Sequence, residues 1–277
     1  MKIDHVSVGG SDLAKMEDSF SEANMKTEYG GPHSSGGTKM SLLGFKDGSY
    51  IELISTVRPD VRATNWRLQI EGNGGPCAWA VAEDDIAGQV AKARRYGIAA
   101  SGPGEYSRRR PDGVSVDWEL GFLGEGEIGA VLPFMIKDRT PREFRVRPSP
   151  SVSGGTLKGI RAVVIGVRDI GQSMRLFEEM YDWGEPAITQ GPWEGVRLAN
   201  FTGAPVVLAE PAGAAWLSER LERFGECPCA FLIGSDDLDE AGKAHPLEAR
   251  TGWFAGDSIR WVSPLREAGM MIGLVGR

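Results

Sequence analysis

Four stretches of the chain repeat one order of hydrophobic and polar positions. Each has a short apolar run, then acidic or polar residues, then apolar residues at helical spacing. The apolar run predicts a strand, and the helical spacing predicts an amphipathic helix that follows it. The four stretches are residues 3–13, 76–86, 160–170 and 228–238.

An aspartate precedes the helical part of each stretch and sets the alignment of the four copies. These residues are Asp12, Asp85, Asp169 and Asp237. An Asp in this position accepts hydrogen bonds from free N–H groups of the first helical turn, so we expect each to begin a helix. The same alignment places His5 opposite alanines in the other copies, namely Ala78, Ala162 and Ala230.

Apolar stretches separated by turn residues follow each predicted helix and indicate further strands. In the first copy these are residues 25–29, 38–45 and 49–55. Each copy is thus predicted to be a βαβββ unit. A stretch rich in Pro, Arg, Ser and Gly separates the second copy from the third, which is typical of a domain boundary. We therefore predict three parts, which are a first domain at 1–140, a linker at 141–156 and a second domain at 157–277.

Composition excludes several classes of protein. The net charge of −7 argues against a nucleic-acid binder, and no apolar run is long enough to span a membrane. The first residues lack the apolar core and cleavage site of a signal peptide, so we expect a cytoplasmic protein. Three cysteines do not indicate a disulfide framework, and we expect them to be small core residues.

Four βαβββ copies in two pairs resemble the vicinal oxygen chelate superfamily, which includes glyoxalase I, extradiol dioxygenases, methylmalonyl-CoA epimerase and bleomycin-resistance proteins. The first half is most similar to the glyoxalase-like domain branch. The resemblance implies an α+β fold in which four βαβββ modules pair into two cup-shaped half-barrel sheets. It also implies a site inside the cup, with a divalent metal held by the first and fourth strands of a module. The stretches that carry it are residues 3–13, 30–55, 107–122 and 132–141.

Carried onto this sequence, the resemblance implies that His5 and Glu52 are metal ligands. Strand alternation places Glu52 on one face with Tyr50 and Ile54, where a carboxylate needs a partner or a cation. Imidazole and carboxylate ligands suit Zn, Mn, Fe, Co or Ni. His33, in the glycine-rich stretch 30–37, is a candidate third ligand or an acid–base group, and a solvated loop position is the alternative.

Without a metal, His5 and Glu52 would form an acid–base pair. Histidine titrates near neutrality, and burial would raise the pKa of Glu52 toward it. The predicted catalytic residues are Glu52, as this carboxylate, and His33, as the acid–base candidate of the glycine-rich stretch. Arg109 is predicted to bind a carboxylate or carbonyl of the substrate, with Arg108 and Arg110 in an exposed loop. Trp118 is predicted to be a substrate contact, with a place in the core as the alternative.

Ligand positions are missing from the other copies, where alanines stand opposite His5 and the strand ends 206–209 and 272–275 are apolar. We expect the second half to have lost its site, and a two-ligand metal site is incomplete. The expected function is an enzyme that acts on a small carbonyl compound by metal-assisted or acid–base isomerisation or lyase chemistry, and extradiol ring cleavage is disfavoured. The alternative is a protein that binds a small molecule without turnover. The internal duplication makes a monomer feasible.

Overall fold

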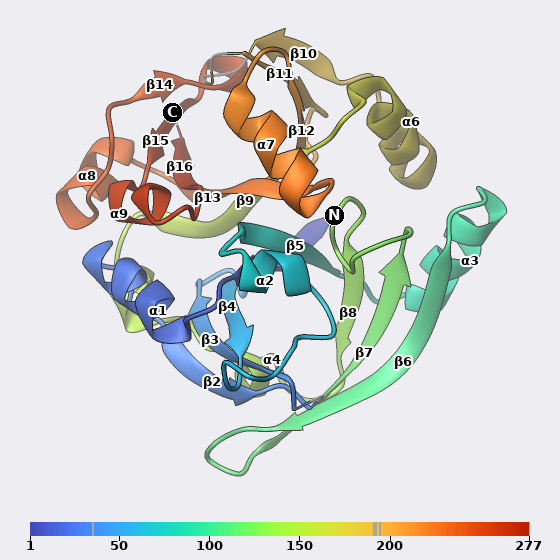
Figure 1. Ribbon diagram of the computed structural model, residues 1–277, viewed down its shortest axis with the longest axis vertical. Coiled ribbons are helices and arrows are strands. Elements are labelled where there is room, and N and C mark those ends of the chain that lie inside the picture. Colours follow the sequence, from blue (N-terminus) through green and yellow to red (C-terminus); the bar gives the residue numbers. More distant parts are fainter. Residues whose placement is uncertain (35, 191–192, 194, 277) are drawn as a thin grey trace.

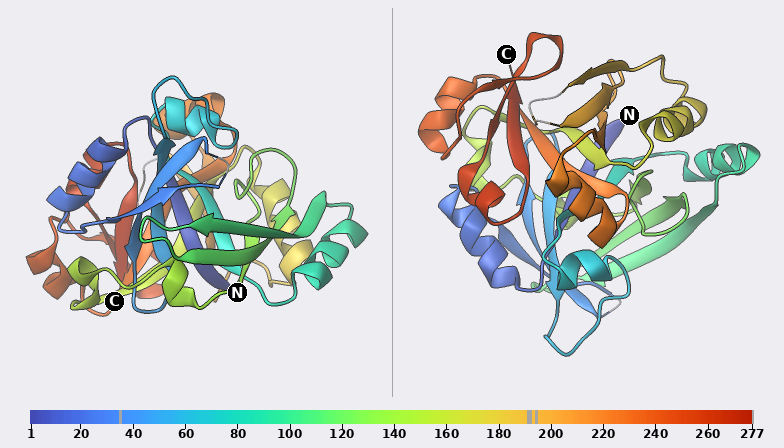
Figure 2. Two further views of the ribbon diagram at one scale, coloured as in Figure 1. Left: turned by 90° about the horizontal axis from the view of Figure 1, so that it is seen from below. Right: turned by 45° about the horizontal axis from the view of Figure 1, so that its top comes forward.

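The computed structural model describes residues 1–34, 36–190, 193 and 195–276. It consists of two curled eight-stranded sheets with helices that pack against the sides by which the sheets face each other, which confirms the predicted α+β class (Figures 1 and 2). The first sheet has the order β2-β3-β4-β1-β5-β8-β7-β6, and the second has the order β10-β11-β12-β9-β13-β16-β15-β14. Each order is two four-stranded modules joined at their first strands, as the fourfold repeat predicts.

The elements of the four modules follow the predicted βαβββ order. The first sheet contains β1 (Lys2–Gly9), α1 (Leu13–Glu22), β2 (Glu28–Pro32), β3 (Thr38–Gly44) and β4 (Tyr50–Thr56), then β5 (Gly75–Ala82), α3 (Ile86–Arg95), β6 (Ala100–Arg109), β7 (Ser115–Leu123) and β8 (Phe134–Asp138). The second contains β9 (Leu157–Gly166), α6 (Ile170–Tyr181), β10 (Ala187–Gln190), β11 (Val196–Asn200) and β12 (Val206–Pro211), then β13 (Cys227–Ser235), α8 (Leu238–Ala244), β14 (Thr251–Gly252), β15 (Ser258–Trp261) and β16 (Ile272–Gly276).

Further helices lie between the modules and between strands of the last module. They are α2 (Arg67–Glu71), α4 (Arg142–Arg145), α5 (Pro150–Ser153), α7 (Ala215–Phe224), α9 (Ser263–Glu267) and a 3-10 turn at Phe254–Gly256. Within the described residues, no helix is both long and apolar enough to cross a membrane.

The four aligned aspartates begin the module helices, as predicted. Asp12 accepts a hydrogen bond from the N–H of Ala14, and Asp169 accepts one from Gln172. Asp85 and Asp237 cap α3 and α8 in the same way. Because each carboxylate meets N–H groups that have no partner within the helix, it ties the end of the strand to the first turn.

The core lies between the two sheets. Alternate residues of the central strands point into it, such as Val8 and Trp79 of the first sheet and Val163 and Phe231 of the second, and they belong to one buried cluster. In Figure 1 the first sheet lies below the second, and β5 packs against β13 and β1 against β9. The opposite residues of β1 and β4 point into the cup of the first sheet, and this alternation sets which side chains can form a site.

The segment 141–156, predicted to be a linker, packs against the first sheet. It contains α4 and α5, and Arg145 at the end of α4 is buried. Ser149 donates its backbone N–H to the carbonyl of Gly44, and its Oγ accepts the N–H of Gly44 at 3.1 Å. The segment is therefore part of the wall of the first cup, while the domain boundaries at 140 and 157 stay a prediction.

Candidate active site

A small cavity of about 110 Å³ lies in the first cup. His5 of β1 and Glu52 of β4 both line it, because His5 pairs with Tyr50 and Ser7 pairs with Glu52 in the parallel ladder between these strands. The remaining lining is mostly apolar. It consists of Met40, Leu42, Tyr50, Trp66, Trp118, Leu120, Phe134 and Ile136, together with His33, Arg108 and Arg145.

His5 is held by the carboxylate of its neighbour Asp4. The ladder between β1 and β5 is irregular between Ile3 and His5, and the Oδ1 of Asp4 lies 2.7 Å from the Nδ1 of His5. Burial raises the pKa of Asp4, but Arg145 and His5 lower it more strongly, so the net pKa lies well below its usual value. An ionised carboxylate can only accept hydrogen bonds. The Nδ1 of His5 therefore carries the hydrogen, and its Nε2 is the nitrogen left for a ligand.

Two arginines of the segment 141–156 compensate the charge of Asp4. The guanidinium of Arg145 donates to both carboxylate oxygens, at 2.7 Å and 2.9 Å, and it also pairs with Asp138. Arg142 donates to Asp4 as well. Because Asp4 and Arg145 are both buried and fully hydrogen-bonded, they form a rigid support beneath the imidazole of His5.

Two aromatic rings fix the plane of the imidazole. The ring of Tyr50 stacks on His5 with centroids 4.6 Å apart, and Phe134 meets it edge-on at 5.2 Å. The hydroxyl of Tyr50 accepts a hydrogen bond from Arg145 at 3.0 Å. Burial raises the pKa of Tyr50, so its hydroxyl is neutral at physiological pH.

His33 and Glu52 form a second pair across the cavity. The Nε2 of His33 lies 3.2 Å from the Oε1 of Glu52, and its Nδ1 lies 2.8 Å from the hydroxyl of Thr38. Ser7 donates its hydroxyl to the other carboxylate oxygen of Glu52 at 3.4 Å. His33 thus contacts the site and does not occupy the alternative position, a solvated loop. Ser35 of the same loop lies outside the described residues.

The expected upward shift of the pKa of Glu52 is wrong. Burial raises this pKa, but the hydrogen bond from His33 and the nearby positive charges lower it to a net value of about 2. Glu52 is therefore a carboxylate at neutral pH and accepts a hydrogen from the Nε2 of His33. It therefore has no proton to give and cannot act as the acid of the site.

The two predicted substrate contacts fall in different places. Trp118 lines the cavity, but Arg109 is exposed, and its neighbour Arg108 lines the cavity instead. Arg108 and Arg109 both lie in β6 and not in a loop, so alternation along the strand sends their side chains to opposite faces. The sequence did not indicate which of the two faces the cup, because this stretch was expected to be an exposed loop, where strand alternation does not apply.

Asp4, Tyr50 and Arg145 are site residues that the sequence reasoning missed. Asp4 stands next to His5, and the only signal was a charged residue within an apolar strand. Arg145 is separated from it by 141 positions and lies in a segment with linker composition.

The metal that the superfamily implies does not fit the donors present. In the part of the chain that the structure describes, no three His, Cys, Asp or Glu side chains gather closely enough to hold a metal ion. The Nε2 of His5 is available, but both oxygens of Glu52 accept hydrogen bonds from side chains, and one of these bonds also engages the Nε2 of His33. Three protein ligands are typical of a catalytic zinc site. The observed geometry is that of hydrogen-bonded acid–base groups.

The second cup is filled by side chains. The places of His5 are taken by Ala162 and Ala230, and both belong to a buried apolar cluster with Trp193 and Trp261, whose rings stack at 5.2 Å. Within the first sheet, Phe134 of β8 pairs with Ala80, just as Glu52 pairs with Ser7 in the first module. The polar groups of the site thus come from the first module and from β6 and α4.

Comparison with known proteins identifies the family. The model of the glyoxalase-like domain family matches residues 3–181, which is more than half of the chain. The protein therefore belongs to the glyoxalase-like domain family, within the vicinal oxygen chelate superfamily. No curated protein matches the sequence.

Three solved structures share the fold over 99% of this chain. A hypothetical protein from Staphylococcus aureus is 14% identical with a TM-score of 0.63, and 98% of its chain is covered. A mutant of 4-hydroxymandelate synthase from Streptomyces coelicolor is 11% identical with a TM-score of 0.61 and 92% of its chain covered. A fusion of a xylose isomerase-like TIM barrel with 4-hydroxyphenylpyruvate dioxygenase is 12% identical, with a TM-score of 0.58 and 48% of its chain covered. At these identities the likeness shows the fold alone.

Proposed function

We propose that this protein is an enzyme that removes a proton beside the carbonyl group of a small organic molecule, in an isomerisation or lyase reaction. The observation that supports this most strongly is the contact of 2.7 Å between the Asp4 carboxylate and the Nδ1 of His5, at the wall of the cavity. A carboxylate in this place orients the imidazole and stabilises the positive charge that it gains as a base.

His5 is the proposed general base. Its Nε2 takes a proton from the carbon next to the carbonyl, and the electron pair of that C–H bond moves toward the carbonyl oxygen. In an isomerisation the same proton equivalent returns to carbon, so the reaction needs no oxidant or co-reactant. The stacked ring of Tyr50 and the edge of Phe134 keep the imidazole in one orientation.

His33 is the proposed partner of the carbonyl oxygen. Its Nε2–H is held by Glu52, which is ionised and buried. When substrate binds, its carbonyl oxygen lies beside this N–H and accepts a hydrogen bond from it. The bond stabilises the negative charge that develops on the carbonyl oxygen. Trp118, Leu120 and Phe134 form an apolar wall that limits water around these groups. The size of the cavity favours a small substrate.

Metal-assisted proton removal is the alternative to the acid–base mechanism proposed here, and a metal analysis distinguishes the two. Protein purified without chelators or nickel resin should be analysed for bound metal. Because the donors are engaged in hydrogen bonds, we expect less than stoichiometric metal. Stoichiometric metal that is lost in both His5→Ala and Glu52→Ala would replace the acid–base form with the metal-assisted one.

Hydrogen exchange tests the proposed reaction directly. Small carbonyl compounds are incubated with the protein in D₂O, and loss of the proton signal beside the carbonyl is followed by NMR. We expect exchange with the wild type and a loss of about 10²-fold or more in His5→Gln. His245→Gln is the matched control, because His245 is also buried but binds the carbonyl of Ala23, away from the cavity. Ligand binding without exchange for any compound would favour the binding-only alternative.

A further inference from the structure

Arg108 is a buried cation without a carboxylate partner. Its residue is 7% exposed, and its guanidinium donates to the carbonyl oxygens of Gly30 at 2.5 Å and of Arg145 at 3.1 Å. Among the described residues, none of the ion pairs within 4.0 Å includes Arg108. Carbonyl oxygens satisfy two of the five guanidinium N–H donors but bring no opposite charge. Because a buried charge is costly without an opposite charge, a bound anion would stabilise the guanidinium of Arg108.

The arginines beside it differ in this respect. Arg145 is paired with Asp4 and Asp138, and Arg110 is paired with Asp112 at 2.8 Å. These pairs are close to neutral and leave the charge of Arg108 in place. Burial lowers the pKa of Arg108 and the charge of Glu52 raises it, but the direct partners of Glu52 are His33 and Ser7.

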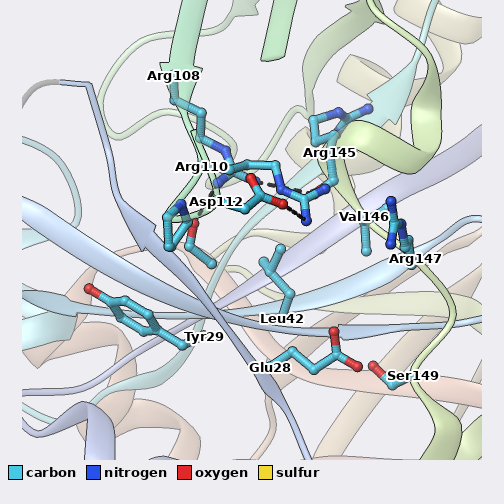
Figure 3. A pocket seen from close by; sticks show the side chains of 12 residues that line it. Glu28, Tyr29, Leu42, Arg108, Arg110, Asp112, Arg145, Val146, Arg147 and Ser149 are labelled. Atoms are coloured by element: carbon cyan, nitrogen blue, oxygen red, sulfur yellow. Dashed lines mark hydrogen bonds and ion pairs between the residues drawn. The ribbon is translucent and has the colours of Figure 1, made fainter. Parts of the chain in front are cut away.

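Arg108 also stands between two cavities. Together with Leu42 and Arg145 it lines both the active-site cavity and a second cavity of about 240 Å³ (Figure 3). In Figure 3 the side chains of Arg108 and Arg110 lie together above Leu42, whereas Glu28 lies on the other side, beside Ser149. Asp112 lies on the arginine side too, but Arg110 pairs with it, so Arg108 is the cation there without a carboxylate partner among the ion pairs of the described residues.

We propose that Arg108 binds the oxyanion of the substrate, a carboxylate or a phosphate group, at the junction of the two cavities. This inference rests on the proposed function and narrows its substrate class to small anionic carbonyl compounds. The free N–H groups of the guanidinium donate to two oxygens of the anion, and its planar geometry suits both groups. The carbonyl end of the substrate then lies between His5 and His33, and the anionic end fixes its orientation.

Arg220 shows what an arginine with a purely structural role looks like here. Its guanidinium donates to the carbonyls of Gly74, Pro76 and Pro228, and so joins the two halves of the chain. Arg108 makes fewer such bonds and faces two cavities. The contrast favours a ligand as the remaining partner of Arg108.

Inorganic phosphate and acetate serve as probes in the first experiment. Binding is measured by calorimetry and by the shift in Tm, each against sodium chloride of equal ionic strength. We expect at least one of the two anions to bind and raise the Tm of the wild type, and the stronger of them indicates which oxyanion the site takes. Arg108→Gln should weaken this binding about tenfold or more, and Arg108→Lys should restore part of it. Arg95→Gln, a change of an exposed arginine on α3, should leave it unchanged.

The outcomes separate this proposal from the proposed function. Equal anion binding by the wild type and Arg108→Gln, or no binding of either anion by the wild type, would overturn the anion site. His5→Gln should bind the anion as the wild type does, since His5 has no part in this contact. Anion binding that depends on Arg108, in a protein that exchanges no substrate proton, would keep the anion site and refute the proposed catalysis.

Discussion

The carboxylate of Asp4 lies 2.7 Å from the Nδ1 of His5, although the two residues are neighbours on one strand. Adjacent side chains of a regular strand point to opposite faces. The irregular pairing of β1 with β5 removes this restriction and lets one side chain orient the other. The support of the proposed base is thus built into the backbone of β1.

Asp4→Asn should lower activity and stability together. The amide keeps the size of the side chain but removes the charge that orients His5 and compensates Arg145, so we expect the exchange rate to fall about 10²-fold or more. Loss of one partner of a buried ion pair costs about 3–5 kcal/mol in the free energy of unfolding. NMR exchange and urea denaturation measure the two effects. Asp112→Asn, in a half-exposed ion pair, is the control, and equal effects of both changes would contradict the role of Asp4.

Glu52 should contribute a pH-dependent part of the stability. Its pKa falls from 4.5 in the unfolded chain to about 2 in the folded protein, because the hydrogen bond and charge of His33 outweigh burial. The folded state binds this proton less readily, so the stabilisation is complete above about pH 4.5 and is lost as the pH falls to about 2. The shift corresponds to about 3 kcal/mol. Urea denaturation between pH 6 and pH 2 should therefore show a smaller loss of stability in Glu52→Gln than in the wild type, and parallel curves would refute the assignment.

Gly44→Ala should weaken the docking of the segment 141–156. An added Cβ would collide with the carbonyl oxygen of Arg147 and displace the chain that carries Arg145. We expect a loss of about 1–3 kcal/mol in the free energy of unfolding and a lower exchange rate. Gly154→Ala is the matched control. Its Cβ would meet open space among the described residues, in a helical backbone conformation that alanine adopts easily, so its stability should stay within about 0.5 kcal/mol of the wild type.

The three cysteines should be inert in the folded protein. Cys77, Cys227 and Cys229 are buried free thiols, and burial raises the pKa of each, for Cys229 to about 12. Because the thiolate is the reactive form, a thiol reagent should label the native protein slowly and the unfolded protein at all three positions. Mass spectrometry counts the labels, and rapid labelling without denaturant would show that the core opens easily.

The fourfold repeat was readable because its signal is local. Apolar runs, helical spacing and the capping aspartates are each set within about a dozen residues. The boundaries of the strands were less exact. The strand expected at 25–29 is found as β2, which begins at Glu28 and ends at Pro32.

The site was only partly readable, because several of its contacts join distant segments. His5 and Glu52 followed from strand alternation and family resemblance, and both line one cavity. The choice of Arg109 over Arg108 failed because the stretch was expected to be a loop, whereas β6 extends to Arg109 and its alternation turns Arg108 inward. The low pKa of Glu52 depends on a contact with His33 that crosses between loop and strand, and periodicity carries no information on it.

The position of Arg145 has a practical consequence for dividing this chain. It follows the last strand of the first sheet, yet its guanidinium satisfies the anion beneath His5. A fragment that ends at residue 140 would keep the buried Asp4 carboxylate but lack Arg142 and Arg145, which compensate its charge. Any attempt to express the N-terminal half alone should therefore keep α4 and α5, so that the excised piece retains its internal counterions.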